Sequence, residues 1–286
     1  MNVLDLFSGI GGFSLGLERA GMRTVAFCEI EPYARAVLKK HWPQVPCYDD
    51  VRTLTADRLR ADGIAADVIC GGFPCQDIST AWDGPGLTGE RSGLWSEYLR
   101  LVREVGPRFI IVENVAALLN RGLDQILGNL AEIGYDAEWH CVPASAVGAP
   151  HIRDRIWIIA YPDCEQHEGD CSANWRPTAE GLYADLAHAD RFRCDEMEQS
   201  KSGRSFGEGA ISKALYAGFT RRRQGWEPEP NVGRVADGVP RRVDRLRGLG
   251  NAVVPQIPEI IGRAIMKVST VSPANPTEDV GCPRIP

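Results

Sequence analysis

The chain has 286 residues, a mass of 31.4 kDa and a formal net charge of −6, and 44% of its residues are hydrophobic. No run approaches the roughly 20 apolar residues that cross a bilayer, so we expect no membrane partner. The nine cysteines are odd in number and scattered, which disfavours a disulfide framework, and the early Asp5 without a basic stretch disfavours a secretory signal. We therefore expect a globular protein of a reducing, cytoplasmic compartment.

The first 160 residues alternate between strand-like and helix-like patterns. Apolar runs predict strands at residues 3–7, 24–28, 67–70, 109–112 and 155–160. Apolar positions spaced by three and four predict helices at residues 13–20, 32–41, 95–105 and 123–133. This alternation predicts an α/β fold with a doubly wound, mostly parallel sheet.

The pattern changes between residues 161 and 247, where Asp, Glu, Gly, Ser, Arg and Pro dominate. A stretch of this length predicts either a smaller irregular lobe or a long functional insertion. We expect regular structure again over residues 248–268, with a helix at residues 258–267. The proline-containing tail, residues 269–286, is expected to be disordered.

Positive charge concentrates late in the chain. Residues 201–250 hold 11 basic and 5 acidic residues, a net +6, and because the whole chain is at −6 the rest carries −12. The excess includes Arg221, Arg222, Arg223, Arg241 and Arg242. A solvated basic face and a surface that contacts phosphates explain this equally well.

A glycine-rich segment joins the first predicted strand to the first helix. It contains Asp5, Phe7, Ser8, Gly9, Ile10, Gly11 and Gly12, and it ends at a helix N-terminus. Glu29, followed by Ile30, ends the second strand, where an acid can accept hydrogen bonds from ribose hydroxyls. Asp50 could accept from an adenine amine. Together these residues predict a site for a nucleoside-bearing cofactor.

Two further strand ends carry reactive groups. Pro74 and Cys75 follow two glycines after the strand at residues 67–70, so the thiol lies on a tight loop. Glu113 follows the apolar run of the neighbouring strand, and we expect it to lie near Cys75. Arg153 and Arg155 precede the last strand with a spacing of two, which predicts that both point to one side of that strand.

The order of these motifs resembles that of the DNA (cytosine-5-)-methyltransferase family. Phe7 to Gly12 is similar to the S-adenosylmethionine motif, Phe73 to Gln76 to the nucleophile loop, and Glu113 to Val115 to the third catalytic signature. Gly89 to Leu94 is similar to a segment lining the cofactor pocket, and Gly250 to Pro255 to the motif that returns to the cofactor. The resemblance covers roughly residues 1–160 and 248–268.

The family's glutamine-x-arginine-x-arginine segment is changed in one position, because His151 stands where the family has glutamine. Both arginines of the segment, Arg153 and Arg155, are kept. The substitution concerns the structural role of that first residue rather than the chemistry.

The resemblance implies a specific reaction and partners. Cys75 would add to carbon 6 of a flipped-out cytosine, Glu113 would stabilise the adduct, and Arg155 with Arg153 would hold the ring carbonyl and a nearby phosphate. Asn251 and Ala252 would join the cofactor site. The expected contacts to double-stranded DNA come from Gln76, Ser79, Arg91, Arg221, Arg222, Arg223, Arg241 and Arg242. Residues 161–247 would form the target-recognition lobe of a monomeric enzyme, which could accompany a cognate restriction endonuclease.

Three other functions are alternatives to this interpretation. The same chemistry on RNA stays open, because the catalytic motifs would be shared. A catalytically retired DNA-binding relative is disfavoured by the retained Cys75, Glu113 and Arg155. A dehydrogenase is excluded by the glycine spacing.

A zinc cluster of Cys164, His167, Cys171, His188 and Cys194 is disfavoured because its spacing fits no pair-and-pair pattern, so no metal is expected.

Overall fold

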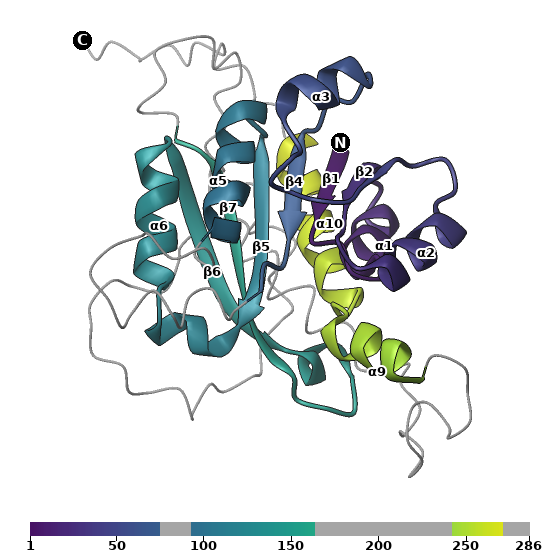
Figure 1. Cartoon of the computed structure of the whole chain (residues 1–286). Coiled ribbons are helices and arrows are strands. Elements are labelled where there is room, and N and C mark those ends of the chain that lie inside the picture. Colours follow the sequence, from purple (N-terminus) through teal and green to yellow (C-terminus); the bar gives the residue numbers. More distant parts are fainter. Residues whose placement is uncertain (75–92, 164–241, 271–286) are drawn as a thin grey trace, which may run out of the picture.

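The computed structural model describes residues 1–74, 93–163 and 242–270, and it contains a seven-stranded sheet (Figure 1). The strand order is β3-β2-β1-β4-β5-β7-β6. The strands are β1 (Asn2–Leu6), β2 (Arg23–Cys28), β3 (Cys47–Tyr48), β4 (Val68–Gly71), β5 (Phe109–Val115), β6 (Tyr135–Pro143) and β7 (Asp154–Pro162).

One strand is reversed. β1 pairs in parallel with β2 and β4, β2 with β3, and β4 with β5, whereas β7 runs antiparallel to both β5 and β6. The predicted α/β class and the mostly parallel sheet are thereby confirmed. Because β7 is reversed, its first residues lie at the same edge of the sheet as the last residues of β5.

Helices cover both faces of the sheet. The helical elements are α1 (Gly12–Arg19), α2 (Pro32–His41), α3 (Ala56–Ala61), α5 (Gly93–Val105), η1 (Ala116–Asn120), α6 (Leu123–Glu132), η2 (Ala144–Val147), α9 (Arg242–Asn251) and α10 (Gln256–Thr270). Successive residues of a strand point to opposite faces, so Ile110 and Val112 join one core cluster and Phe109 and Ile111 the other. The first cluster includes α5 and α6, and the second includes α1 and α10.

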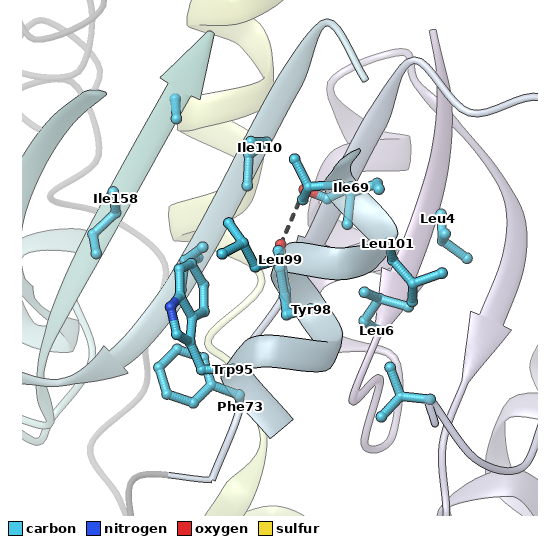
Figure 2. Packing of buried hydrophobic residues seen from close by; sticks show 14 of the residues in the cluster. Leu4, Leu6, Ile69, Phe73, Trp95, Tyr98, Leu99, Leu101, Ile110 and Ile158 are labelled. Carbon is cyan, nitrogen blue, oxygen red and sulfur yellow. Dashed lines mark hydrogen bonds between the residues drawn. The ribbon is translucent and has the colours of Figure 1, made fainter. Parts of the chain in front are cut away.

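An aromatic stack supports the end of β4. Tyr98 on α5 is fully buried, and its hydroxyl donates to the carbonyl oxygens of Ile69 (3.3 Å) and Ile111 (3.4 Å), one of which is drawn in Figure 2. Its ring lies 5.5 Å from that of Trp95, which in turn lies 5.3 Å from that of Phe73. Aromatic packing against α5 therefore supports the segment that follows β4.

Several described elements have no counterpart among the predicted ones, namely β3, α3, η1, β6, η2 and α9. The expectation of irregular structure up to residue 247 is wrong at its end, because α9 begins at Arg242. β6 is an edge strand with mixed polar residues, which hides its period. α9 is mostly charged and exposed, so no apolar stripe marks it.

The expectation that Arg153 and Arg155 share one side of a strand is also wrong. β7 begins at Asp154, and Arg153 precedes it with a left-handed backbone, φ 38°. None of the helices within the described ranges is long and apolar enough to span a membrane. The same ranges contain no group of three or more His, Cys, Asp or Glu placed to hold a metal ion.

Candidate active site

A cavity of about 730 Å³ lies at the carboxyl ends of the parallel strands. This is the edge where open α/β sheets bind ligands, because loops from neighbouring strands converge there. Its lining includes Phe7, Gly9, Ile10, Glu29, Ile30, Tyr33, Asp50, Arg52, Phe73, Pro74, Glu113, Asn114, Arg153, Arg155, Arg247 and Asn251. The cavity therefore brings together the glycine loop and the end of β5.

Glu113 and Arg155 form an ion pair at the edge of this cavity. The Arg155 Nε lies 2.9 Å from the Glu113 Oε1, and the two side chains are 23% and 13% exposed. Burial raises the pKa of Glu113, while the charges of Arg155 and Arg153 oppose that rise. The carboxyl group is thus biased toward its protonated form and is held in one orientation by a guanidinium group.

The chain that leads to the predicted nucleophile is tied to the same strand. The Asn114 Nδ2 donates to the Phe73 carbonyl oxygen at 3.0 Å, and Pro74 lines the cavity. Cys75 is the next residue, but it lies outside the described residues, as do Gln76, Ser79 and Arg91. The closeness of the Cys75 thiol to Glu113 consequently stays a prediction.

Glu29 organises the glycine loop. Its Oε2 accepts a hydrogen bond from the Gly9 backbone N–H at 2.6 Å, and its Oε1 accepts from the Glu31 backbone N–H at 2.8 Å. Phe7, Gly9 and Ile10 line the cavity beside it, and Ile30 is 60% exposed at the same place. Glu29 is therefore buried, oriented and next to the space where a ligand would lie.

Four residues of the predicted cofactor loop lie behind the cavity lining. Asp5 is fully buried and accepts a hydrogen bond from the Ser14 hydroxyl (2.7 Å), while the Ser8 hydroxyl donates to the Asp5 carbonyl oxygen (2.6 Å). Gly11 packs against Trp42, and Gly12 against Val253. These four residues support the glycine loop from its buried side. None of them is among the residues that line the cavity.

Asp50 lies in the lining but is already paired. Arg52 donates to it through its backbone N–H (2.9 Å) and through Nε and Nη2, the latter at 2.6 Å. These hydrogen bonds lower the pKa of Asp50. An adenine amine would have to share this carboxylate with Arg52, a residue that the sequence analysis did not identify.

α9 closes one side of the cavity. Asn251 is in the lining, whereas Ala252 is not; the Ala252 carbonyl oxygen accepts a hydrogen bond from the Arg153 Nη2 at 2.9 Å. α9 also contributes Gly250, the first residue of the motif expected to return to the cofactor, and Asp244, Arg247 and Gly248, which were not among the predicted cofactor residues. The glycines close to Asn251 are the one signal that could have indicated a close approach there.

The predicted contacts to nucleic acid fall mostly beyond the described ranges. Arg221, Arg222, Arg223 and Arg241 lie outside the described residues, and only the backbone of Arg242 is described, in α9. The disfavoured zinc cluster, Cys164, His167, Cys171, His188 and Cys194, also lies outside them. Cys28 and Cys70 are buried and form no disulfide.

Comparison with known proteins gives the relatives of this chain. A type II methyltransferase of Bacillus subtilis, M2.BsuMI, is 38% identical over 168 residues, which are 56% of this chain and 42% of that protein. M.NgoMIV of Neisseria gonorrhoeae is 28% identical over 92% of this chain and 96% of its own length. The chain covers less than half the length of several of its relatives, among them M2.BsuMI.

Solved structures share the fold. A protein described as a candidate DNA modification methyltransferase from an Escherichia coli prophage superposes with a TM-score of 0.59 at 20% identity, over 94% of this chain and 99% of that one. The Entamoeba histolytica methyltransferase EhMeth superposes with a TM-score of 0.57 at 14% identity, over 93% of this chain and 98% of that one. The family model described as C-5 cytosine-specific DNA methylase matches residues 1–204. The chain therefore belongs to the C-5 cytosine-specific DNA methylase family.

Proposed function

We propose that this protein transfers a methyl group from S-adenosylmethionine to carbon 5 of cytosine in double-stranded DNA. The observation that carries the proposal is the Glu113–Arg155 ion pair, which lies beside Pro74 in the cavity that the glycine loop also lines. Family membership and the type II methyltransferases among the relatives support the same reaction.

The lining fits a nucleoside-bearing cofactor. Glu29 is buried at the end of β2 with an oriented carboxylate, and Phe7, Ile10 and Ile30 offer apolar surface around it. Glu29 would accept from ribose hydroxyls with its remaining lone pairs, and the apolar side chains would contact the base. When bound, S-adenosylmethionine supplies a methyl group on a positively charged sulfur, which is open to attack by a nucleophilic carbon.

The residues of this chain would make cytosine nucleophilic. Carbon 5 of cytosine is a weak nucleophile, and addition of the Cys75 thiolate to carbon 6 would turn the ring into an enamine. Glu113, in its protonated form, would donate to the ring nitrogen that gains electron density. After methylation, loss of the carbon 5 proton to a base would expel the Cys75 thiolate and restore the aromatic ring.

Arg155 would keep the Glu113 carboxyl in place during these steps. Its Nε lies 2.9 Å from the Glu113 Oε1, and its Nη1 donates to the Asp154 carbonyl oxygen at 2.7 Å. The Nη2 group would then donate to the cytosine carbonyl oxygen. Base attack needs access above the ring plane, so the cytosine would have to leave the helix, which costs about a few kcal/mol. The arginine-rich stretch of residues 201–250 would offset this cost through phosphate contacts.

Bisulfite sequencing of DNA from cells that express the chain tests the proposal. We expect cytosine methylation within a defined short sequence, and none in cells that express Cys75→Ser. Purified protein with duplex DNA containing 5-fluorocytosine should form a covalent adduct that survives denaturing electrophoresis, since the fluorine cannot leave as a proton does. Methylation of RNA but not DNA, or an adduct with Cys75→Ser, would contradict the proposal.

A further inference from the structure

α9 lines the cavity although most of its residues are exposed to solvent. It contributes Arg247, Gly248 and Asn251 to the lining, yet Val243, one turn before Arg247, is 72% exposed. A Cβ built on Gly248 would lie 3.3 Å from the Tyr33 ring, so this glycine allows α9 to approach α2 closely. The Arg247–Glu31 pair is exposed and 4.0 Å long, which contributes little to holding the helix.

A side chain from outside the helix contacts the chain at the C-terminal end of α9. The last turn of α9 has no basic residue of its own, although free carbonyl groups and the negative end of the helix dipole lie there. The Arg153 Nη2 donates to the carbonyl oxygen of Ala252, the residue that follows the helix, at 2.9 Å. A cation from a loop 99 residues earlier in the chain thus occupies the place of a C-terminal capping residue.

The backbone of Arg153 supports a specific role for this contact. Its φ of 38° is in the left-handed region, which non-glycine residues seldom adopt without compensation. Among the described residues, Phe7 is the other non-glycine residue with a positive φ, and both line the cavity. The strained backbone directs the Arg153 side chain toward α9, whereas Arg155, within β7, pairs with Glu113.

We infer that Arg153 is a positioning residue that holds the C-terminal end of α9 against the cavity and thereby encloses the bound cofactor. The inference rests on the proposed cofactor site, and it gives Arg153 a role of its own: the charges of both arginines oppose the rise in the pKa of Glu113, whereas Arg153 donates the hydrogen bond to the Ala252 carbonyl oxygen. It predicts an effect of Arg153 on cofactor affinity that needs no DNA.

The test compares Arg153→Met, Arg153→Lys and the wild type without DNA. Arg263→Ala is the matched control, because Arg263 is an exposed arginine that pairs with Glu259 on α10, away from the cavity. Hydrogen exchange of the α9 amides reports how well the helix is held, and calorimetric titration with S-adenosylhomocysteine reports affinity. Both readouts are independent of catalysis.

We expect the α9 amides of Arg153→Met to exchange about tenfold faster, since local opening controls their exchange. If α9 of Arg153→Met occupies its position against the cavity only about one tenth of the time, the dissociation constant for S-adenosylhomocysteine should rise about tenfold. Arg153→Lys, which keeps a charge and a donor, should lie between Met and wild type, and Arg263→Ala should match wild type.

Wild-type exchange in α9 of Arg153→Met would overturn the inference, and so would faster exchange with unchanged affinity. A loss of DNA affinity alone would also overturn it, because Arg153 would then act as a phosphate contact. If the wild type binds no cofactor, the proposed function fails, while the exchange data still decide whether Arg153 holds α9. Should Arg153→Met not fold, the comparison of Arg153→Lys with wild type decides by the same two measurements.

Discussion

The Glu113 carboxylate occupies the space that a side chain at Gly72 would need: a Cβ built on Gly72 would lie 2.6 Å from the Glu113 Oε2. Real Cβ atoms do not approach oxygen this closely, so any larger residue there must displace the carboxylate. Gly72 therefore contributes to the active site because its lack of a side chain leaves space for the Glu113 carboxylate. It precedes the Phe73-Pro74 segment that leads to Cys75.

Gly72→Ala should consequently lower the rate of methyl transfer by about a hundredfold, because a displacement of about 1 Å at a reacting group has effects of this size. Single-turnover kinetics with saturating DNA would measure it. Gly128→Ala is the control, since a Cβ at Gly128 meets no atom within 4 Å and Gly128 lies on α6, outside the cavity lining. Equal rates for Gly72→Ala and wild type would show that the Glu113 position is not critical.

The pH dependence of catalysis should depend on Arg155. Burial raises the pKa of Glu113 and Arg155 lowers it, so replacing Arg155 by Met should raise that pKa further. If the protonated carboxyl is the active form, activity falls as pH rises through its pKa, and the alkaline fall should move to higher pH in Arg155→Met. A pH–rate profile of the chemical step tests this, with Glu113→Gln expected to lack the Glu113-dependent limb. An unchanged limb in Arg155→Met would assign that limb to another group.

Asp5 should make the protein less stable as pH rises. Burial raises the pKa of Asp5 to about 8, against about 3.9 in an unfolded chain, so the folded state holds a proton that the unfolded state has lost between these values. The contribution of Asp5 to the free energy of unfolding is then fully present below about pH 4. It is lost as the pH rises toward 8, by about 2–5 kcal/mol. Urea unfolding at pH 5 and pH 8.5 measures the difference.

Asp5→Asn should remove much of this pH dependence, because asparagine can accept from the Ser14 hydroxyl without a titrating proton. Asp57→Asn is the matched control, since Asp57 is 86% exposed in its pair with Arg60. A pH dependence that is the same in wild type and Asp5→Asn would mean that Asp5 is ionised in the folded protein at neutral pH.

Glu29→Gln should weaken cofactor binding more than DNA binding. The amide would place an NH₂ group against the backbone N–H of Gly9 or of Glu31, both of which now donate to the carboxylate. We expect a dissociation constant for S-adenosylhomocysteine at least about tenfold higher, or about 1.4 kcal/mol. Titration calorimetry measures it, with Glu132→Gln as control because Glu132 is exposed and lies outside the cavity lining. A selective loss of DNA binding instead would contradict the role of Glu29 in the cofactor site.

Much of the fold was predictable because its signals are local. α2 runs from Pro32 to His41 as expected, since proline suits the first turn and the apolar positions recur at helical spacing. The mostly parallel sheet follows from the alternation of strands and helices, and because parallel strands share one edge, Glu29, Pro74 and Glu113 all line one cavity.

The rest depended on contacts between distant residues. Nothing local to Arg153 predicts a left-handed backbone or a hydrogen bond to Ala252, which lies 99 residues away. The pairing of Arg52 with Asp50 is local, since the two residues are two positions apart, but it depends on a turn that no sequence pattern marks. β3 has only the two residues Cys47 and Tyr48. Short elements and side-chain pairings such as these carry too little pattern to be recognised in advance.

The reversal of β7 decides which parts of the chain can vary in length without disturbing catalysis. Arg155 stands at the entrance of its strand, opposite Val115, so the connection between β6 and β7 fixes how far the guanidinium reaches toward Glu113. The exit of β7 at Pro162 pairs with Tyr135, at the other edge of the sheet. An insertion after Pro162 therefore enters far from the reacting groups, whereas one residue gained or lost between Pro143 and Asp154 would change the register of the ion pair itself.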